Sequence, residues 1–336
     1  MIFWSPHGEL RLNRILVVGA GNIGSRHLQA LGRSNLALSI VVVDPIVQAL
    51  ETSKQRFDEA AKKGMVRRVE YHQNLDAVGN QFDVGIVATS SDIRRKIIQE
   101  MLDKVEVKNL ILEKVAFQNT RDFEYVIKLL NSKNVKAWIN LPRRVIPFYR
   151  EMKKEVKPHE QVFYTIQGGD WGLACNAIHF IDHLCFLVED TDYEVSCHSL
   201  DRDVKESKRK GFVEFTGALH CHFRNGSELN LISQDGSKQP PLITIVNKSM
   251  LYVIEEEKGS ARVSHEENGW KLEETPFRLY HQSELTNKLV EDIINTGNCG
   301  LTPIQESYLI HRPLLESFIQ HLENLTGKKY SSCPIT

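Results

Sequence analysis

The feature that most restricts the fold of this chain is a glycine-rich turn directly after an apolar run. Residues 15–18 are continuously apolar, and Gly19-Ala20-Gly21-Asn22-Ile23-Gly24 follows them and opens a predicted helix. In a strand–turn–helix unit of this form, the first glycine permits a tight turn, the second lets the backbone approach a pyrophosphate, and the third lets helix and strand pack closely. Unpaired N–H groups at the helix start also attract phosphate. We therefore expect Gly19, Gly21, Asn22, Ile23 and Gly24 to hold a dinucleotide.

A carboxylate further along the chain indicates which dinucleotide to expect. Asp44 follows the second apolar run, 20 residues beyond Gly24, where it can accept hydrogen bonds from the ribose hydroxyls. It would repel a 2′-phosphate, and no arginine follows it directly. NAD is therefore favoured over NADP as the cofactor. The alternative interpretation is a structural glycine turn with a solvated Asp44.

Further apolar runs define an N-terminal domain. Strand-length runs occupy residues 15–18, 38–43, 84–88, 110–112 and 137–139, and helical stretches lie at 24–31, 48–63, 93–103 and 120–132. Continuously apolar strands that alternate with helices are typical of a parallel sheet covered on both faces. We expect a doubly wound α/β Rossmann domain over residues 1–140.

The second half of the chain has a different pattern. A helical stretch at 144–157 and an apolar segment at 173–188 precede several alternating strands within 211–263, which are separated by turn sequences such as Asn225-Gly226. This pattern predicts an α+β domain with an open, largely antiparallel sheet over residues 141–300. Residues 301–336 are expected to form a C-terminal helix and tail that pack back on the N-terminal domain.

Composition excludes several classes of function. Forty-two basic and 43 acidic side chains give a formal charge of −1, so there is no broad basic surface for nucleic acid or an anionic membrane. The six cysteines form no CxxC pair and have none of the spacings of a zinc site, a usage typical of reduced cytosolic thiols. No signal-peptide core and no run of about 18 apolar residues occurs. We expect a cytoplasmic protein without a metal, whose partner is a small-molecule substrate.

Several motifs resemble the oxidoreductase family that contains glucose–fructose oxidoreductase, inositol dehydrogenase and the MocA proteins (Gfo/Idh/MocA). The glycine turn continues Ser25-Arg26-His27, the run at 84–88 is followed by Thr89-Ser90, and the run at 110–112 is followed by Glu113-Lys114. Asn140-Leu141-Pro142-Arg143 is similar to the family's Asn-x-x-Arg segment, and His179-Phe180-Ile181-Asp182 to its His-x-x-Asp segment. The resemblance implies that Thr89, Ser90, Glu113 and Lys114 lie near the nicotinamide. It also implies that the C-terminal domain supplies substrate contacts and the interface of a homodimer or homotetramer.

Two positions depart from the family pattern. Val115 stands where the family usually has proline after the lysine, which removes the usual means of obtaining a cis bond there, because a non-proline cis peptide costs about 2.5–4 kcal/mol. Cys175 stands four residues before His179, where family dehydrogenases often carry an aspartate. The usual acid–base partner is therefore missing at that position.

The resemblance and the residue types together suggest a catalytic pair. Oxidation of a sugar hydroxyl by nicotinamide needs a base for the departing proton and a cation for the developing oxyanion. Lys114 and His179 can supply both, and which of them is the base is left open. The alternatives are a surface lysine after a strand and a core histidine in an apolar helix.

Five further side chains are candidates for substrate binding. Asp182 shares a helix face with His179, and Asn176 lies three residues before it. Trp171 offers an apolar plate for a sugar face. Arg143 and Arg144 could grip a carboxylate or phosphate, because guanidinium groups bind planar anions in bidentate fashion; the alternative for both is a structural salt bridge.

The combined interpretation is a sugar or sugar-derivative dehydrogenase that depends on NAD(P), with a place in bacterial surface-sugar biosynthesis. A second hypothesis keeps the fold and reduces an imine or a linear tetrapyrrole, as the biliverdin reductases do. A third is a regulator that senses NAD without turnover. The departures at Val115 and Cys175 keep the second and third hypotheses open.

Overall fold

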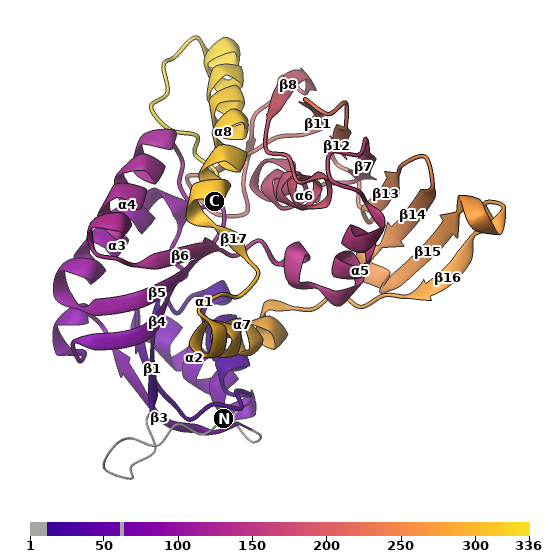
Figure 1. The fold of residues 1–336 in the computed structure, drawn as a ribbon. Coiled ribbons are helices and arrows are strands. Elements are labelled where there is room, and N and C mark those ends of the chain that lie inside the picture. The colour runs from indigo at the N-terminus through magenta and orange to yellow at the C-terminus, as the bar shows by residue number, and fades with distance from the viewer. Residues whose placement is uncertain (1–11, 61–63) are drawn as a thin grey trace. The chain divides into compact units, whose positions relative to one another are not determined.

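The computed structural model describes residues 12–60 and 64–336, which divide into two compact units (Figure 1). Besides the N-terminal part up to residue 116, the first unit contains 124–140 and 280–304, and the second contains 117–123, 141–279 and 305–336. Residues 280–300, which were expected in the C-terminal domain, thus group with the first unit, because local periodicity predicts a helix but not the sheet on which it packs. The tail contacts residues of the predicted N-terminal domain, since the Cys333 N–H donates to the Gln118 carbonyl at 2.8 Å.

The first unit is built on a seven-stranded sheet in the order β17-β6-β5-β4-β1-β2-β3. All neighbouring strands are parallel except β17, which runs antiparallel to β6. The strands are β1 (Asn13–Val18), β2 (Leu38–Val43), β3 (Val66–His72), β4 (Gln81–Val87), β5 (Glu106–Leu112), β6 (Lys136–Ile139) and β17 (Thr302–Pro303). The predicted Rossmann fold is confirmed.

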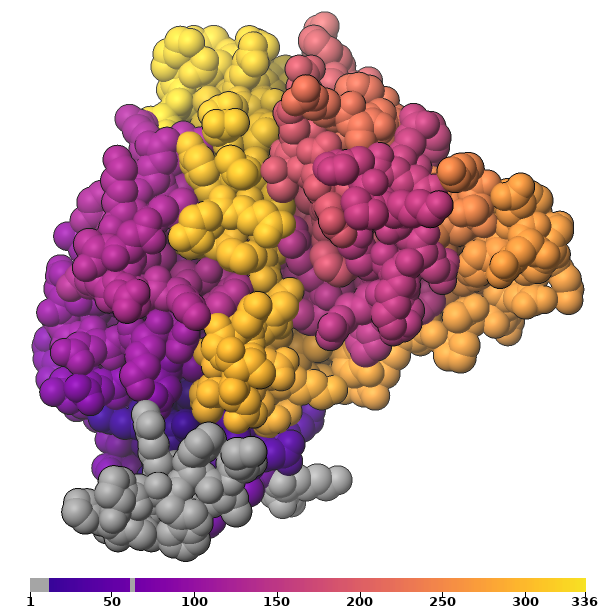
Figure 2. Space-filling model, viewed as in Figure 1, coloured from indigo at the N-terminus to yellow at the C-terminus, as the bar shows by residue number. Residues whose placement is uncertain are grey.

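Helices cover both faces of this sheet. They are α1 (Asn22–Leu31), α2 (Val47–Ala60), α3 (Ser91–Lys104), α4 (Thr120–Ser132) and α7 (Gln282–Thr296). Helix α7 lies beside α1 (Figure 1) and reaches the surface of its unit (Figure 2). Its Glu291 carboxylate accepts hydrogen bonds from the Ser34 hydroxyl at 2.9 Å and the Asn35 N–H at 2.8 Å. A segment late in the sequence therefore completes the nucleotide-binding unit.

Strand β3 is the one strand of the parallel set that the apolar pattern did not predict. It lies at the sheet edge, and its Arg67 and Arg68 are exposed. An edge strand has one solvated side, so it does not need the continuous apolar run that marks the buried strands.

The second unit contains an eight-stranded sheet in the order β16-β15-β14-β13-β7-β12-β11-β8, in which only the β7–β12 pair is parallel. The predicted antiparallel domain is confirmed. Its strands are β7 (Phe163–Gly168), β8 (Tyr193–Leu200), β11 (Gly217–Phe223), β12 (Glu228–Ser233), β13 (Leu242–Val246), β14 (Met250–Glu255), β15 (Ser260–His265) and β16 (Glu273–Pro276). A separate pair is formed by β9 (Lys205–Glu206) and β10 (Val213–Glu214).

The helices of the second unit are α5 (Pro147–Glu155), α6 (Leu173–Val188) and α8 (Ile304–Thr326). Short 3₁₀ helices lie at Leu75–Ala77 in the first unit and at Pro142–Val145, Glu256–Lys258 and Glu266–Asn268 in the second. Within residues 12–60 and 64–336, no helix combines the length and the apolar character that crossing a bilayer requires.

Candidate functional site

The glycine turn between β1 and α1 shows a steric reason for two of its three glycines. Gly19 has a φ of +95°, and a Cβ there would lie 2.9 Å from the Ala88 carbonyl carbon. At Gly24 a Cβ would lie 1.8 Å from the Gly19 carbonyl oxygen, so only glycine allows α1 to pack this closely. At Gly21, by contrast, a Cβ would meet nothing within 4 Å. The first and third glycines serve the packing of the turn, and the second borders open space.

The start of α1 fits a phosphate group. Gly21 occupies the N-cap position, and within the described chain no side chain caps this helix and no acidic residue lies in its first turn. The N–H groups of that turn have no acceptor inside the helix, and they carry the positive end of the helix dipole. The open space at Gly21 beside these donors is a suitable cradle for the pyrophosphate of a dinucleotide. Asn22 and Ile23 would hold it through their backbone N–H groups.

Asp44 follows β2 and contacts the same turn. One carboxylate oxygen accepts the Ala20 N–H at 2.7 Å, and the other accepts the Ile46 N–H at 2.8 Å. Asp44 is therefore not the solvated side chain of the structural alternative. It holds the glycine turn in place, and each oxygen keeps lone pairs for a ribose hydroxyl.

Two more turns follow β4 and β5 at the same edge of the sheet. Thr89 lies after β4, and its buried Oγ1 makes no hydrogen bond to any residue that the structure describes. Ser90 is the N-cap of α3. Lys114, half-buried, follows β5, and the Lys114–Val115 peptide bond is cis. The expectation that valine removes the means for a cis bond here was wrong, since the turn also has a hydrogen-bonding partner from another element, Arg94, that the local sequence does not indicate.

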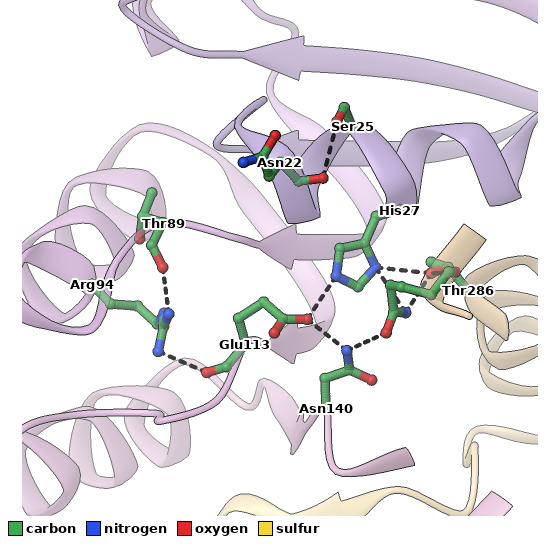
Figure 3. Close-up of polar contacts among 9 residues, drawn as sticks. Asn22, Ser25, His27, Thr89, Arg94, Glu113, Asn140 and Thr286 are labelled. Carbon is green, nitrogen blue, oxygen red and sulfur yellow. Dashed lines mark hydrogen bonds and ion pairs between the residues drawn. The ribbon is translucent and has the colours of Figure 1, made fainter. Parts of the chain in front are cut away.

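The carboxylate of Glu113 joins a buried polar network (Figure 3). Its Oε1 lies 2.8 Å from His27 Nε2 and accepts a hydrogen bond from Asn140 Nδ2 at 2.5 Å. His27 Nδ1 lies 2.8 Å from Thr286 Oγ1, and the Gln282 amide donates to Thr286 Oγ1 at 2.8 Å. The network connects α1 and α7 with the turns that follow β5 and β6.

The residues that contact Glu113 determine its charge state. Burial alone would raise the pKa of Glu113, but the hydrogen bond and charge of His27, together with Asn140 and Arg94, hold that pKa below its usual value of 4.5. A carboxylate can only accept, so His27 Nε2 donates to it. The Gln282 amide nitrogen lies 3.3 Å from His27 Nδ1, so the amide also belongs to this network.

Helix α6 in the second unit carries the candidate substrate residues. Cys175, Asn176 and His179 are partly exposed, whereas their helical neighbours Ala177 and Ile178 are fully buried. Asn176 donates to the Trp171 carbonyl at 2.9 Å, and the partly exposed Trp171 indole donates to the Ile232 carbonyl at 2.9 Å. These contacts fix one partly open face of α6, on which His179 lies.

The structure corrects the prediction for Asp182. It is completely buried, and its two oxygens lie 2.9 and 2.8 Å from the Arg144 guanidinium. A completely buried, paired carboxylate is not open to a substrate hydroxyl, so the predicted substrate contact of Asp182 was wrong. Arg144 also pairs with Glu306 at 2.7 Å, and Arg143 pairs with Glu256 at 2.6 Å. The contacts of both arginines correspond to the alternative of structural salt bridges, because their donors are already bound to carboxylates.

One carboxylate near α6 was missed by sequence reasoning. Glu214, on β10, accepts hydrogen bonds from the Ala174 N–H and, at 3.1 Å, from the Phe215 N–H. Burial raises the pKa of the Glu214 carboxyl, although these N–H donors oppose the shift. Its partner on α6, Ala174, lies 40 residues away in the sequence, so no spacing rule could identify it. Among the described residues, no cluster of three or more His, Cys, Asp or Glu could hold a metal ion.

Comparison with known proteins gives a family match for the N-terminal part of the chain. Residues 13–141 match the family described as "Oxidoreductase family, NAD-binding Rossmann fold", GFO_IDH_MocA. The predicted family and its NAD cofactor are thus confirmed for this part of the chain. No curated protein matches the chain in sequence.

Solved structures of similar fold differ widely in what they do. UDP-N-acetylglucosamine 3-dehydrogenase GnnA from Acidithiobacillus ferrooxidans is 13% identical, with a TM-score of 0.67 over 92% of this chain and 97% of that one. Biliverdin reductase from Synechocystis is 12% identical, with a TM-score of 0.67 over 94% and 99%. A super-repressor mutant of Gal80p from Saccharomyces cerevisiae is 13% identical, with a TM-score of 0.69 over 94% and 97%. At these identities the likeness shows the fold alone.

Proposed function

Residues 13–141 belong to the Gfo/Idh/MocA family of NAD-binding oxidoreductases, and from this we propose that the chain is an NAD-dependent dehydrogenase of a sugar or sugar derivative. The observation that carries the proposal is the order of three turns in one sheet. Strands β1, β4 and β5 are neighbours, and the glycine turn, Thr89 and Lys114 follow their carboxyl ends. Ligands of open α/β sheets bind at that edge. A dinucleotide with its pyrophosphate at Gly21 would extend toward Thr89 and Lys114.

NAD, when bound, supplies the hydride acceptor. The residues of the chain must then hold the substrate hydroxyl and move its proton. We assign this work to Lys114 and His179, of which one takes the proton and the other stabilises the developing charge on oxygen. Thr89 Oγ1, buried without a partner among the described residues, would hydrogen-bond to the nicotinamide ribose. Ser90 and Glu113 would complete that end of the cofactor site.

A carbohydrate substrate is supported by the partly open face of α6. Trp171 presents a rigid apolar ring of the kind that sugar faces stack on, and Asn176 can both donate to and accept from hydroxyl groups. The fold is shared with an enzyme that oxidises a nucleotide sugar. Surface-sugar biosynthesis is the setting that we propose for such a reaction.

The first experiment combines a substrate panel with one pair of lysine variants. Wild type is incubated with NAD and polyols, aldoses, sugar acids and nucleotide sugars, and reduced nicotinamide is followed by absorbance. Lys114→Ala should lose at least about 100-fold in kcat, the lower end of what a proton-transfer group contributes, with NAD affinity retained. The matched control is Lys108→Ala, which removes an exposed lysine of β5, the strand that precedes Lys114. Equal loss of turnover and NAD affinity in Lys114→Ala would refute its catalytic role.

The panel also tests the two alternative functions when biliverdin with NADH is added to it. Cys175 in place of the family's aspartate favours a reaction that needs less base catalysis, such as reduction of a linear tetrapyrrole with NADH. Oxidation of NADH by biliverdin, with no activity on any sugar, would replace the dehydrogenase proposal. Calorimetric binding of NAD without turnover of any compound would favour the regulator.

We also propose a homodimer or homotetramer. On one face of the eight-stranded sheet, Leu242, Val246, Leu251 and Val253 are only partly buried. Neighbouring half-exposed apolar side chains on a sheet are typical of a surface that another subunit covers. Sedimentation equilibrium tests the assembly, and a monomer at all accessible concentrations would refute it.

A further inference from the structure

Arg94 occupies a position that is unfavourable for a cation. It lies in the first turn of α3, where the positive end of the helix dipole opposes a positive charge. Its side chain is also 1% exposed, and burying a charged group carries a further cost in solvation. Both the helix dipole and burial disfavour a cation here, so the reason for an arginine must lie in what the guanidinium binds.

The guanidinium of Arg94 binds backbone carbonyl groups of two separate turns (Figure 3). In the turn after β5 it donates to the carbonyl oxygens of Glu113 at 2.7 Å, Val115 at 2.5 Å and Ala116 at 2.7 Å. In the turn after β4 it donates to the carbonyl oxygen of Thr89. One side chain therefore joins two neighbouring turns at the carboxyl edge of the sheet.

Lys114 lies between the carbonyl groups that Arg94 holds. The carbonyl before Lys114 in the chain belongs to Glu113, and the next one after its own belongs to Val115, so the backbone is fixed on both sides of the lysine. From the opposite direction, the Glu113 side chain is held by His27 and Asn140. The orientation of the Lys114 side chain thus depends on contacts made by its neighbours.

We propose that Arg94 is a positioning residue, which sets the backbone of Lys114 in register with Thr89 and so aims the lysine at the substrate hydroxyl. This inference rests on the proposed dehydrogenase function, in which Lys114 contacts the substrate. A guanidinium suits the task because its donors form a rigid planar fork, whereas a lysine ammonium is a point charge on a flexible stem.

The test uses a readout that needs no substrate. Competitive acetylation followed by mass spectrometry measures the reactivity of Lys114 in wild type, Arg94→Ala and Arg94→Lys, with Lys108 of the same strand as the internal reference. Arg94→Ala is measured again with low-millimolar guanidinium chloride or equal sodium chloride. The control variant is Arg95→Ala, which removes the next arginine of α3, whose guanidinium lies 4.8 Å from the Tyr125 ring centre.

We expect the reactivity of Lys114 relative to Lys108 to change severalfold in Arg94→Ala, to recover with guanidinium but not sodium, and to stay unchanged in Arg95→Ala. In the turnover assay kcat should fall about 100-fold, the loss typical of a misplacement near 1 Å, while affinity for ADP-ribose, a probe of the glycine turn alone, is retained. If Arg94→Ala does not fold, Arg94→Lys decides: altered Lys114 reactivity at an unchanged melting temperature supports the proposal.

Wild-type reactivity of Lys114 in a folded Arg94→Ala protein, or in Arg94→Lys if only that variant folds, would overturn the inference. If wild type itself oxidises no compound of the panel, the proposed function fails, while the labelling result still decides the role of Arg94. The two failures are therefore distinguishable.

Discussion

Two glycines of the same turn should respond in opposite ways to an added methyl group. Gly21 has φ −61° and ψ −163°, which alanine can adopt, and its Cβ would meet nothing within 4 Å. Gly21→Ala should therefore leave stability unchanged or raise it by about 0.4–1 kcal/mol, because alanine restricts the unfolded chain. The methyl group would, however, project into the space proposed for the pyrophosphate. Loss of one hydrogen bond to a charged group costs about 1.5–3 kcal/mol, so the Kd for NAD should rise about 10- to 150-fold.

Gly24→Ala should do the reverse. Its Cβ would lie 1.8 Å from the Gly19 carbonyl oxygen, and a backbone atom cannot swing aside as a side chain can. Overpacking costs about 1–3 kcal/mol or more, and alanine in a helix recovers only about 1 kcal/mol of that. We expect a net loss of about 2 kcal/mol in the free energy of unfolding, at the severe end of the overpacking range.

Urea unfolding and calorimetric titration with NADH separate the two effects. The expected result is a stable Gly21→Ala that binds NADH weakly and a destabilised Gly24→Ala. A Gly21→Ala protein that binds NADH as wild type does would refute the placement of the pyrophosphate at this turn. A Gly24→Ala protein as stable as wild type would refute the steric argument for the third glycine.

Three further predictions follow from individual contacts. Asp44→Asn removes the charge that opposes a 2′-phosphate, so the preference for NAD over NADP should fall about tenfold, or about 1.4 kcal/mol. If the variant prefers NAD over NADP by the same factor as wild type does, the assignment of Asp44 to the ribose is contradicted. Glu113 has a lowered folded pKa, so it contributes stability above its usual value of 4.5 that is lost as pH falls through the folded pKa. Melting temperatures from pH 7 to pH 3 should thus decline less steeply for Glu113→Gln than for wild type, from a lower starting value. Arg144→Leu leaves Asp182 buried without its guanidinium and should cost about 3–5 kcal/mol in urea unfolding, whereas a stable variant with only a raised substrate KM would restore the role of Arg144 in substrate binding.

Signals that lie within a few residues of one another were enough to predict most of the first unit. The apolar runs of β1, β2, β4, β5 and β6 are each buried in one sheet, and the turn after β1 combines three glycines whose spacing reflects local sterics. Strand β3 was not predicted because it lies at the exposed edge of the sheet and lacks a continuous apolar run. Helix α7 lies in residues that the sequence assigned to the C-terminal domain, since its contact with Ser34 spans 257 residues.

The roles of residues whose contacts are distant in the sequence could be seen only in the structure. Asp182 and Arg144 are 38 residues apart in the sequence. The helical spacing of three from His179 therefore indicated a substrate-binding role for Asp182 and gave no sign of its ion pair with Arg144. Arg94 is the opposite case. From the sequence it would be taken for an ordinary surface residue of a helix, and only the structure shows that it binds four backbone carbonyl groups. Local preference and tertiary contact disagree at Arg94, and such disagreements concentrate where a site needs a fixed geometry. The fold is shared by a dehydrogenase, a reductase and a repressor protein, so the fold alone does not determine the reaction. In our proposal the reaction depends on how firmly Lys114 is held, and Arg94 and Glu113 are the residues that we assign to hold it.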